Sequence, residues 1–326
     1  TLFLLRLVFL ALISQPSFGE EFWNEFRGPT ADGHSPSDKL PLNWSDNKNV
    51  TWKTEISGMA WSSPVAWGNQ IWVTNATPDG KKLFAVCLDA KSGTIIHNVT
   101  VFEIAKPMYC IGYNSYASPT PAVEESRVWV HYGSAGTACL DTKTGRVLWT
   151  RQDLPCNHLR APGSSPIVFH DFIIVNFDGA DHQYVVALNK ETGKTEWKTD
   201  RTINYGSDNG DRKKAYCTPA IFEHDGRLQM VSPAAVATIS YDPRDGKELW
   251  KKPIPSCKSL YGSSTSPIGY EDLLILVLDD DNNLPGSRVS RSRILAVRKA
   301  DGETAWETPR PFQRSGWSTP IIWKHG

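Results

Sequence analysis

The stretch Ala138-Cys-Leu-Asp-Thr-Lys-Thr-Gly-Arg-Val-Leu-Trp149 decides the fold, because its pattern returns at a regular interval. An apolar strand leads into a polar turn that ends in Gly, and an aromatic residue follows four positions later. The turn glycines are Gly93, Gly145, Gly193, Gly246 and Gly302, which lie 48 to 56 residues apart. The aromatic positions are His97, Trp149, Trp197, Trp250 and Trp306. Such a period predicts one supersecondary unit that is stacked several times.

A second marker follows the same period. A Ser or Thr, then Pro, then an apolar residue opens each unit, at Ser63-Pro64, Thr120-Pro121, Ser165-Pro166, Thr218-Pro219, Ser266-Pro267 and Thr319-Pro320. Two independent markers with one period indicate a true structural repeat rather than a chance match.

Each unit divides into four short strands separated by turn formers. In the first unit the expected strands are Pro64–Trp67, Gln70–Ala76, Lys82–Leu88 and Thr94–Thr100. Four antiparallel strands in about fifty residues are typical of a propeller blade. Blades packed around an axis bury both of their faces, and we expect the repeated Trp to fill the space between neighbours. We therefore predict an all-β fold, a β-propeller of four-stranded antiparallel blades, with five full blades and a partial sixth.

The two ends of the repeat region suggest how the ring closes. Residues 49–56 match the fourth-strand pattern, and residues 318–326 open a sixth blade. We expect residues 50–56 to close the ring as the outer strand of a final blade, whose other strands lie beyond Gly326. The complete propeller would then have eight blades, with seven as the alternative. The predicted propeller domain is 50–326, preceded by an N-terminal extension over residues 20–49.

The first residues predict export. An apolar run from Leu2 to Ile13 leads into small residues up to Gly19, which is typical of a secretory signal peptide over residues 1–19. An uncleaved anchor is the alternative. The expected location is periplasmic or secreted, with no transmembrane domain after cleavage. In such a compartment the six cysteines can form disulfides, although buried free thiols are an equal alternative.

The charge balance excludes one class of partner. Lys plus Arg number 35 and Asp plus Glu number 35, so the net charge is zero. A nucleic-acid binder needs a basic surface, so no nucleic-acid partner is expected.

The repeat carries a family resemblance. The segments from Ala138 to Trp149 and from Ala187 to Trp197 resemble the unit of pyrroloquinoline-quinone (PQQ) type propellers. That group includes quinoprotein alcohol dehydrogenases and BamB-like outer-membrane assembly propellers. Phe22 to Gly33 and His182 to Gly193 are similar to exported PQQ-like propellers of planctomycete-type bacteria, which are mostly uncharacterised in function. The resemblance covers residues 22–326 and implies a quinoprotein-like fold, with PQQ and Ca²⁺ as a conceivable cofactor pair.

An enzyme of this group needs a quinone, a Ca²⁺ ion held by carboxylate and amide oxygens, and an Asp base. The sequence has no adjacent Cys pair, no C-x-x-C-H haem motif and no assignable base or metal-ligand set. Asp279-Asp-Asp-Asn-Asn283 suits an ion by composition, but it lacks a D-x-D-x-D-G spacing, and we interpret it as a solvated loop. The sequence thus favours a binding or scaffold module for a protein, peptide or small ligand. A PQQ-dependent dehydrogenase of alcohols or sugars is the alternative. A BamB-like assembly factor is a third reading, but no Cys precedes Cys87 to carry a lipid anchor.

The candidate ligand-binding residues precede the Ser/Thr-Pro markers. In a propeller these blade-to-blade segments converge on one mouth of the central channel, where aromatic and Arg side chains suit recognition. The candidates are Trp61, Tyr116, Arg160, Tyr216, Tyr261 and Trp317, with Tyr113 and Arg314 nearby. The alternative is that these aromatic residues pack between blades as structure.

Overall fold

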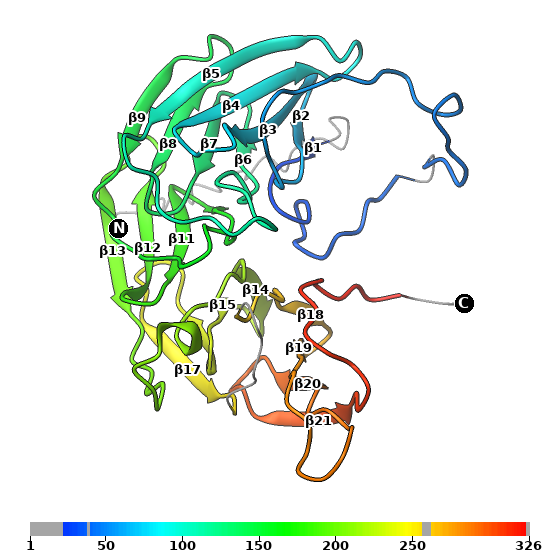
Figure 1. Ribbon diagram of the computed structural model, residues 1–326, viewed down its shortest axis with the longest axis vertical. Coiled ribbons are helices and arrows are strands. Elements are labelled where there is room, and N and C mark those ends of the chain that lie inside the picture. Colours follow the sequence, from blue (N-terminus) through cyan, green and yellow to red (C-terminus); the bar gives the residue numbers. More distant parts are fainter. Residues whose placement is uncertain (1–21, 38–39, 256–261, 324–326) are drawn as a thin grey trace, which may run out of the picture.

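The computed structural model describes residues 22–37, 40–255 and 262–323. Five antiparallel sheets follow one another in chain order around an arc, each with its first strand nearest the centre (Figure 1). The arrangement confirms the predicted β-propeller. The first sheet contains β1 (Phe22–Trp23), β2 (Val65–Trp67), β3 (Gln70–Ala76), β4 (Lys82–Asp89) and β5 (Ile95–Glu103). The second contains β6 (Ala122–Glu124), β7 (Arg127–His131), β8 (Thr137–Asp141) and β9 (Val147–Arg151).

The remaining three sheets repeat this meander. The third contains β10 (Ile167–Phe169), β11 (Phe172–Asp178), β12 (Gln183–Asn189) and β13 (Thr195–Asp200). The fourth contains β14 (Ala220–His224), β15 (Arg227–Pro233), β16 (Ala237–Tyr241) and β17 (Glu248–Pro253). The fifth contains β18 (Ile268–Tyr270), β19 (Leu273–Leu278), β20 (Arg293–Arg298) and β21 (Thr304–Pro309). One 3₁₀ turn, η1 (Gly210–Arg212), lies between the third and fourth sheets.

The repeated Trp and the repeated Gly form one contact between neighbouring blades. Trp149 of the second blade donates from Nε1 to the carbonyl of Lys190 at 3.0 Å. A Cβ added at Gly193, three residues further on, would lie 2.6 Å from the same indole ring. Gly246 and Gly302 give room in the same way to Trp197 and Trp250, whereas Gly145 meets His97. Each of these glycines also supplies the positive φ that the turn needs.

A β-bulge aims this Trp. In the third blade Ala187 pairs with Trp197, while the next residue, Leu188, pairs with Thr195. Glu196 is the extra residue, and the register shifts at the same place in the other four blades. Because a bulge bends a strand and increases its twist locally, the outer strand changes direction close to the position of the Trp.

The Ser/Thr-Pro markers form a ladder of hydrogen bonds around the channel. The backbone N–H of each marker residue donates to the hydroxyl of the next one, at 3.0 to 3.1 Å. The donor–acceptor pairs are Ser63–Thr120, Thr120–Ser165, Ser165–Thr218, Thr218–Ser266 and Ser266–Thr319. The hydroxyl thus satisfies a donor of the preceding unit, and the following Pro removes a donor where the inner strand begins.

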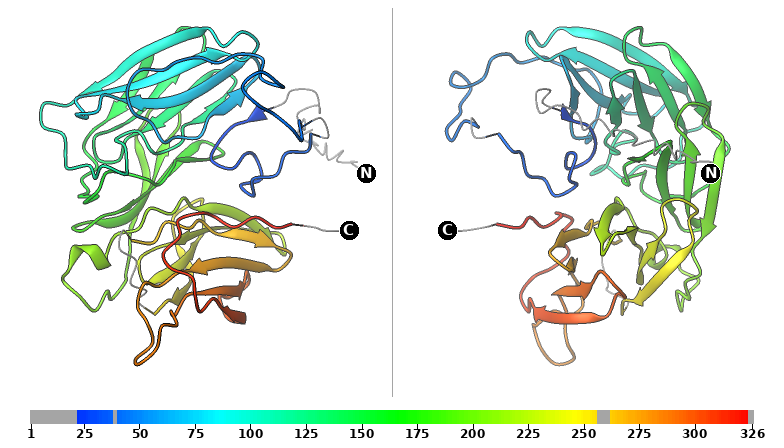
Figure 2. Two further views of the ribbon diagram at one scale, coloured as in Figure 1. Left: turned by 45° about the vertical axis from the view of Figure 1, so that its right-hand side comes forward. Right: turned by 180° about the vertical axis from the view of Figure 1, so that it is seen from behind.

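The segments before β2 and after β21 lie on the open side of the arc (Figures 1 and 2). Trp52 donates to the carbonyl of Ala90 at 2.9 Å and lies against Gly93, as an outer-strand Trp does in the other blades. Residues 49–57 form no strand in the described structure, so ring closure by residues 50–56 and a count of eight blades stay predictions. Thr319 holds the ladder position expected of a sixth unit.

Three further expectations concern the signal peptide, the cysteines and membrane-spanning segments. The predicted signal peptide of residues 1–19 lies outside the described residues. Cys87, Cys110, Cys139, Cys156 and Cys217 are free thiols, and Cys257 is not among the described residues. In the described ranges, no helix has the length and apolar character to cross a membrane.

Candidate functional site

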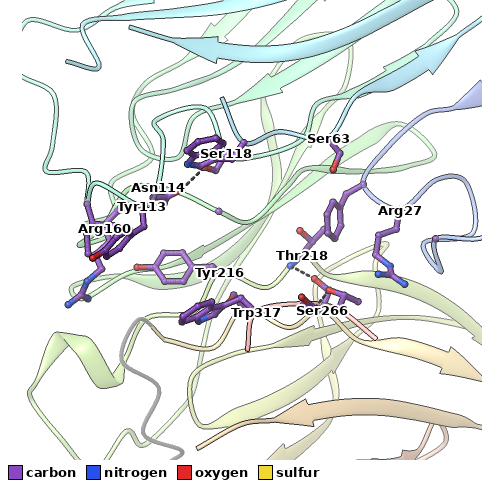
Figure 3. Close-up of a pocket in the computed structure, with 18 of the residues that line it drawn as sticks. Arg27, Ser63, Tyr113, Asn114, Ser118, Arg160, Tyr216, Thr218, Ser266 and Trp317 are labelled. Carbon is purple, nitrogen blue, oxygen red and sulfur yellow. Dashed lines mark hydrogen bonds between the residues drawn. The ribbon is translucent and has the colours of Figure 1, made fainter. Parts of the chain in front are cut away.

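A cavity of about 1070 Å³ opens at one mouth of the channel, on the side where the Ser/Thr-Pro ladder runs. Its size is at the upper end of the range for small-molecule sites. Its wall comes from the segment before each marker, and Figure 3 shows these side chains facing one another across it. The lining includes Trp61, Ser63, Tyr113, Asn114, Arg160, Tyr216, Thr218, Ser266, Trp317 and Thr319.

The structure brings most of the predicted mouth residues together. Trp61, Arg160, Tyr216 and Trp317 line this cavity, as does Tyr113. Trp61 and Trp317 keep 56% and 47% of their surfaces exposed, so they are not buried between blades as structural aromatics would be. Ligand binding by these residues stays a prediction.

Two predicted residues lie elsewhere, and a third falls outside the described residues. Tyr116 lines a smaller neighbouring cavity of about 200 Å³, where its ring covers Gly80 and its hydroxyl donates to the carbonyl of Met108 at 2.7 Å. Arg314 donates to Asn283 Oδ1 at 2.5 Å and lies in the loop that follows β21. Tyr261 is not among the described residues.

Hydrogen bonds fix one wall of the cavity. Tyr216 donates from its hydroxyl to the carbonyl of His158 at 2.8 Å, and Asn114 donates to the carbonyl of Arg160 at 2.9 Å. Arg160 Nη1 lies 2.5 Å from Asp211 Oδ1, and this ion pair raises the pKa of Arg160. The Tyr216 ring and the Arg160 guanidinium are therefore held in place before any ligand arrives.

The floor of the cavity comes from a segment that the repeat analysis did not identify. Trp23, Phe26 and Arg27 line the cavity, and we call these three residues its floor. Arg27 donates to the carbonyls of Ala31 at 3.2 Å and Pro320 at 2.8 Å, which ties this segment to the sixth unit. The aromatic cluster in Phe22-Trp-Asn-Glu-Phe26 lies outside the repeats. An aromatic cluster that the repeat pattern does not explain was the sequence signal that could have identified this segment.

The acidic run between β19 and β20 supports the segment that carries Trp317. Asp279 Oδ1 pairs with Arg310 Nη1 at 2.6 Å, and its other oxygen accepts from the Gly316 amide at 3.0 Å. Asp281 accepts hydrogen bonds from the amide and hydroxyl of Ser315, at 2.9 and 2.6 Å. The run is a loop, as interpreted from sequence, but it is not solvated as expected, because Asp280 is buried and the Asp279 side chain is 7% exposed. Its carboxylates instead hold the segment that leads to the cavity.

Two buried imidazoles lie behind the same wall. His158 Nε2 accepts from the amide of Ser134 at 3.1 Å, and His131 Nδ1 lies 2.8 Å from Thr137 Oγ1. Burial lowers the pKa of His158 to about 4 and that of His131 to about 3. Both rings pack against Phe177 and are neutral near pH 7.

The residues of the cavity do not fit a Ca²⁺–quinone pair. Among the described lining residues, Arg27 and Arg160 carry charge and none carries a carboxylate. Across the described part of the chain, His, Cys, Asp and Glu side chains do not gather in threes around a common point. Since Ca²⁺ takes six to eight oxygen ligands and favours carboxylates, the described lining offers it a poor donor set. The geometry suits an uncharged or anionic ligand with apolar groups.

Comparison with known proteins agrees with the fold. A family model described as "Outer membrane protein assembly factor BamB" matches residues 43–308. No curated protein matches the chain by sequence. Among solved structures, BamB from Moraxella catarrhalis is similar at 17% identity and a TM-score of 0.53, with 75% of this chain and 62% of that chain covered.

Quinohemoprotein alcohol dehydrogenases share the architecture. The Comamonas testosteroni enzyme is similar at 13% identity and a TM-score of 0.60, with 88% of this chain and 49% of that chain covered. The Pseudomonas putida HK5 enzyme ADHIIG is similar at 14% identity and 0.52, with 79% and 43% covered. The chain thus spans about two fifths to three fifths of the length of these structures. At these identities the likeness concerns the fold alone.

Proposed function

The chain belongs to the family of propellers described as outer membrane protein assembly factor BamB, and from this premise we propose that it is an exported binding module. Its channel-mouth cavity takes a peptide or a small ligand with aromatic or apolar groups. The apolar run of residues 2–13 supports export to the periplasm or beyond.

One observation carries the binding role. Six successive units contribute to a single cavity, and its rim exposes the rings of Trp61, Tyr113 and Trp317. Large amphipathic rings supply contact area at low conformational cost and are enriched at binding hot spots. Hydroxyl groups of the ladder residues Ser63, Thr218 and Ser266 offer polar contacts below these rings.

The family description supports a polypeptide as the ligand, because it names an assembly factor. The mixture of aromatic rings, hydroxyl groups and two guanidinium groups suits the apolar side chains and the carbonyl or carboxylate oxygens of a peptide.

Selection of peptides with a photoreactive label tests the proposal. A library of random decapeptides that each carry one benzophenone is selected on the immobilised chain, irradiated, and mapped by mass spectrometry. We expect the cross-links to fall on residues 59–63, 109–118 and 316–319, which contribute to the rim. Cross-links spread over the outer strands β5, β9 and β13, or no enrichment over a Trp61→Ala/Trp317→Ala variant, would contradict it.

A further inference from the structure

The segment that begins at Phe22 contacts the inner strands of three successive blades. β1 pairs antiparallel with β2, with Trp23 opposite Ala66. The carbonyl of Asn24 accepts from the amide of Val123 on β6 at 2.8 Å. One residue later, Glu25 Oε2 accepts from the amide of Val168 on β10 at 3.0 Å. The segment therefore adds a two-residue strand to the first sheet and then turns, with single hydrogen bonds to the second and third blades.

The positions that receive this strand are equivalent in the repeat. Ala66, Val123 and Val168 each stand two residues after the Pro of their marker, and Ile221 and Gly269 hold this position in the next two blades. An inner strand that ends a sheet presents backbone groups without a partner from its own sheet. Such an edge accepts an extended polypeptide by strand addition.

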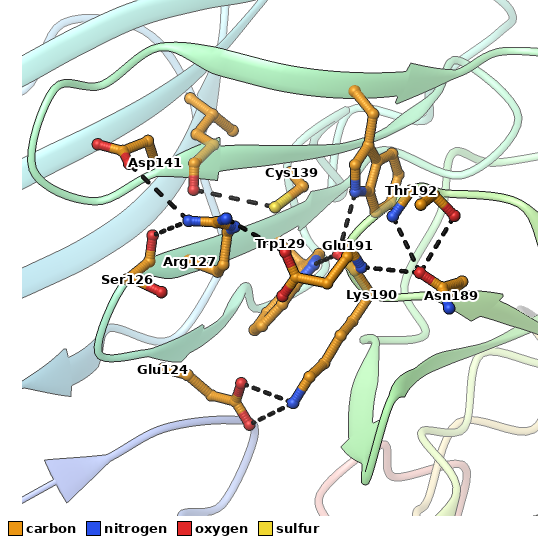
Figure 4. A network of polar contacts seen from close by, with 12 residues as sticks. Glu124, Ser126, Arg127, Trp129, Cys139, Asp141, Asn189, Lys190, Glu191 and Thr192 are labelled. Carbon is orange, nitrogen blue, oxygen red and sulfur yellow. Dashed lines mark hydrogen bonds and ion pairs between the residues drawn. The ribbon is translucent and has the colours of Figure 1, made fainter.

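The contacts of this segment with the inner strands are few, although Arg27 anchors its end through the carbonyl of Pro320. The regular pairing of the segment covers two residues, and the carboxylate of Glu25 meets a backbone amide rather than a cation. Glu124 of β6 is the charged neighbour that acts on Glu25, and its own partner is Lys190 Nζ at 3.0 Å (Figure 4). An ionised carboxylate in such surroundings costs free energy, because no cation among the described residues pairs with Glu25 to offset its lost hydration.

We infer that the edge of β2, together with the backbone amides of Val123 and Val168, forms a docking groove for a polypeptide segment, and that residues 22–27 occupy it in cis. A partner strand gains access by displacing this segment. The inference deepens the proposed binding function, since Trp23 and Phe26 form the floor of the same cavity. A displaced floor would let a bound polypeptide run from the cavity into the channel.

Ionisation of Glu25 sets how firmly the cis strand is held. Burial, with a contribution from Glu124, raises the pKa of Glu25 from 4.5 to about 7. A raised carboxyl pKa stabilises the docked state fully below about pH 4.5, and this contribution is lost as the pH rises toward 7. The groove is therefore more accessible at pH 8.5 than at pH 5.

A synthetic peptide of residues 22–33 that carries Glu25→Gln tests the inference. Its binding to the full chain is measured by fluorescence anisotropy at pH 5 and pH 8.5, with a scrambled peptide as control. We expect the affinity to rise at least about tenfold at the higher pH, because one unit of pKa corresponds to a factor of ten. The chain with Glu25→Gln should show no such rise, because its cis strand no longer ionises. Equal affinity at both pH values, or the same rise in Glu25→Gln, would overturn the inference.

Two further measurements keep the test decisive. The first is hydrogen exchange of residues 120–126 and 165–170 in the wild-type chain, corrected for the intrinsic exchange rates. Exchange of these amides should be faster at pH 8.5 than at pH 5. Unchanged protection would overturn the inference without the need for a variant. The response to the peptide should persist in a Trp61→Ala/Trp317→Ala variant. Loss of the rim aromatic residues alone would therefore leave the pH-dependent response to the peptide unchanged, so the cavity proposal and the groove proposal can fail independently.

Discussion

The indole ring of Trp197 lies over Gly246 of the next blade, so close that a Cβ at Gly246 would come within 2.4 Å of the ring. Gly246 also has a φ of +72°, which disfavours residues with a side chain. The replacement Gly246→Ala therefore combines backbone strain with overpacking. We expect a loss of about 2–4 kcal/mol in the free energy of unfolding, measured by urea denaturation.

Gly226 provides the matched control for this prediction. It has the same φ of +72°, but a Cβ there would meet nothing within 4 Å. Gly226→Ala should cost only the backbone term, about 1 kcal/mol. Equal losses at the two positions would show that the Trp–Gly contact contributes nothing to the join between blades.

The hydroxyl ladder predicts a difference between two small substitutions at Ser165. Its hydroxyl accepts from the amide of Thr120 at 3.0 Å, and both residues are buried. Ser165→Ala leaves that amide without a partner and should destabilise the fold by about 1–3 kcal/mol. Ser165→Thr keeps a hydroxyl and introduces the residue found at the equivalent positions Thr120 and Thr218. Its melting temperature should stay close to that of the wild type. Identical melting temperatures for the two variants would refute the role of the ladder.

The buried imidazole of His158 predicts how stability changes with pH. The pKa of His158 falls from 6.5 to about 4 on folding, so the unfolded chain binds a proton first. Stability is then fully present above pH 6.5 and falls as the pH drops toward 4. In His158→Gln this part of the acid slope should vanish, which reduces the slope by up to about 1.4 kcal/mol per pH unit.

Denaturation at a series of pH values measures this slope. His182→Gln, which removes an exposed imidazole, is the comparison variant. A His158→Gln curve that runs parallel to wild type would mean that protonation of His158 is not linked to unfolding.

The sequence was sufficient to predict the repeat and some of the residues that meet at the channel mouth. Its markers have fixed positions within each unit, so the sequence alone predicted that Trp61, Tyr216 and Trp317 lie at one mouth of the channel. The Ser/Thr-Pro pattern was visible in the sequence, but the hydrogen bonds between its residues could not be predicted, because each bond joins residues about fifty positions apart.

The floor of the cavity could not be predicted in this way. Phe22 to Arg27 has no counterpart in other units, so comparison within the chain gave no position for it. Its contacts to Val123 and Val168 depend on the curvature of the whole arc. The side-chain partners of Tyr116 and Arg314 depend likewise on loop conformation rather than on the repeat.

The affinity of a peptide selected from the library, measured by calorimetry on three variants, tests the central claim most directly. Trp61→Ala and Trp317→Ala remove rings at the cavity rim, and Trp306→Ala removes one that is 42% exposed on the outer strand β21. The account predicts that each rim variant weakens binding by about 1–3 kcal/mol, while Trp306→Ala keeps the wild-type affinity. Wild-type affinity in both rim variants would contradict the assignment of the cavity as the binding site.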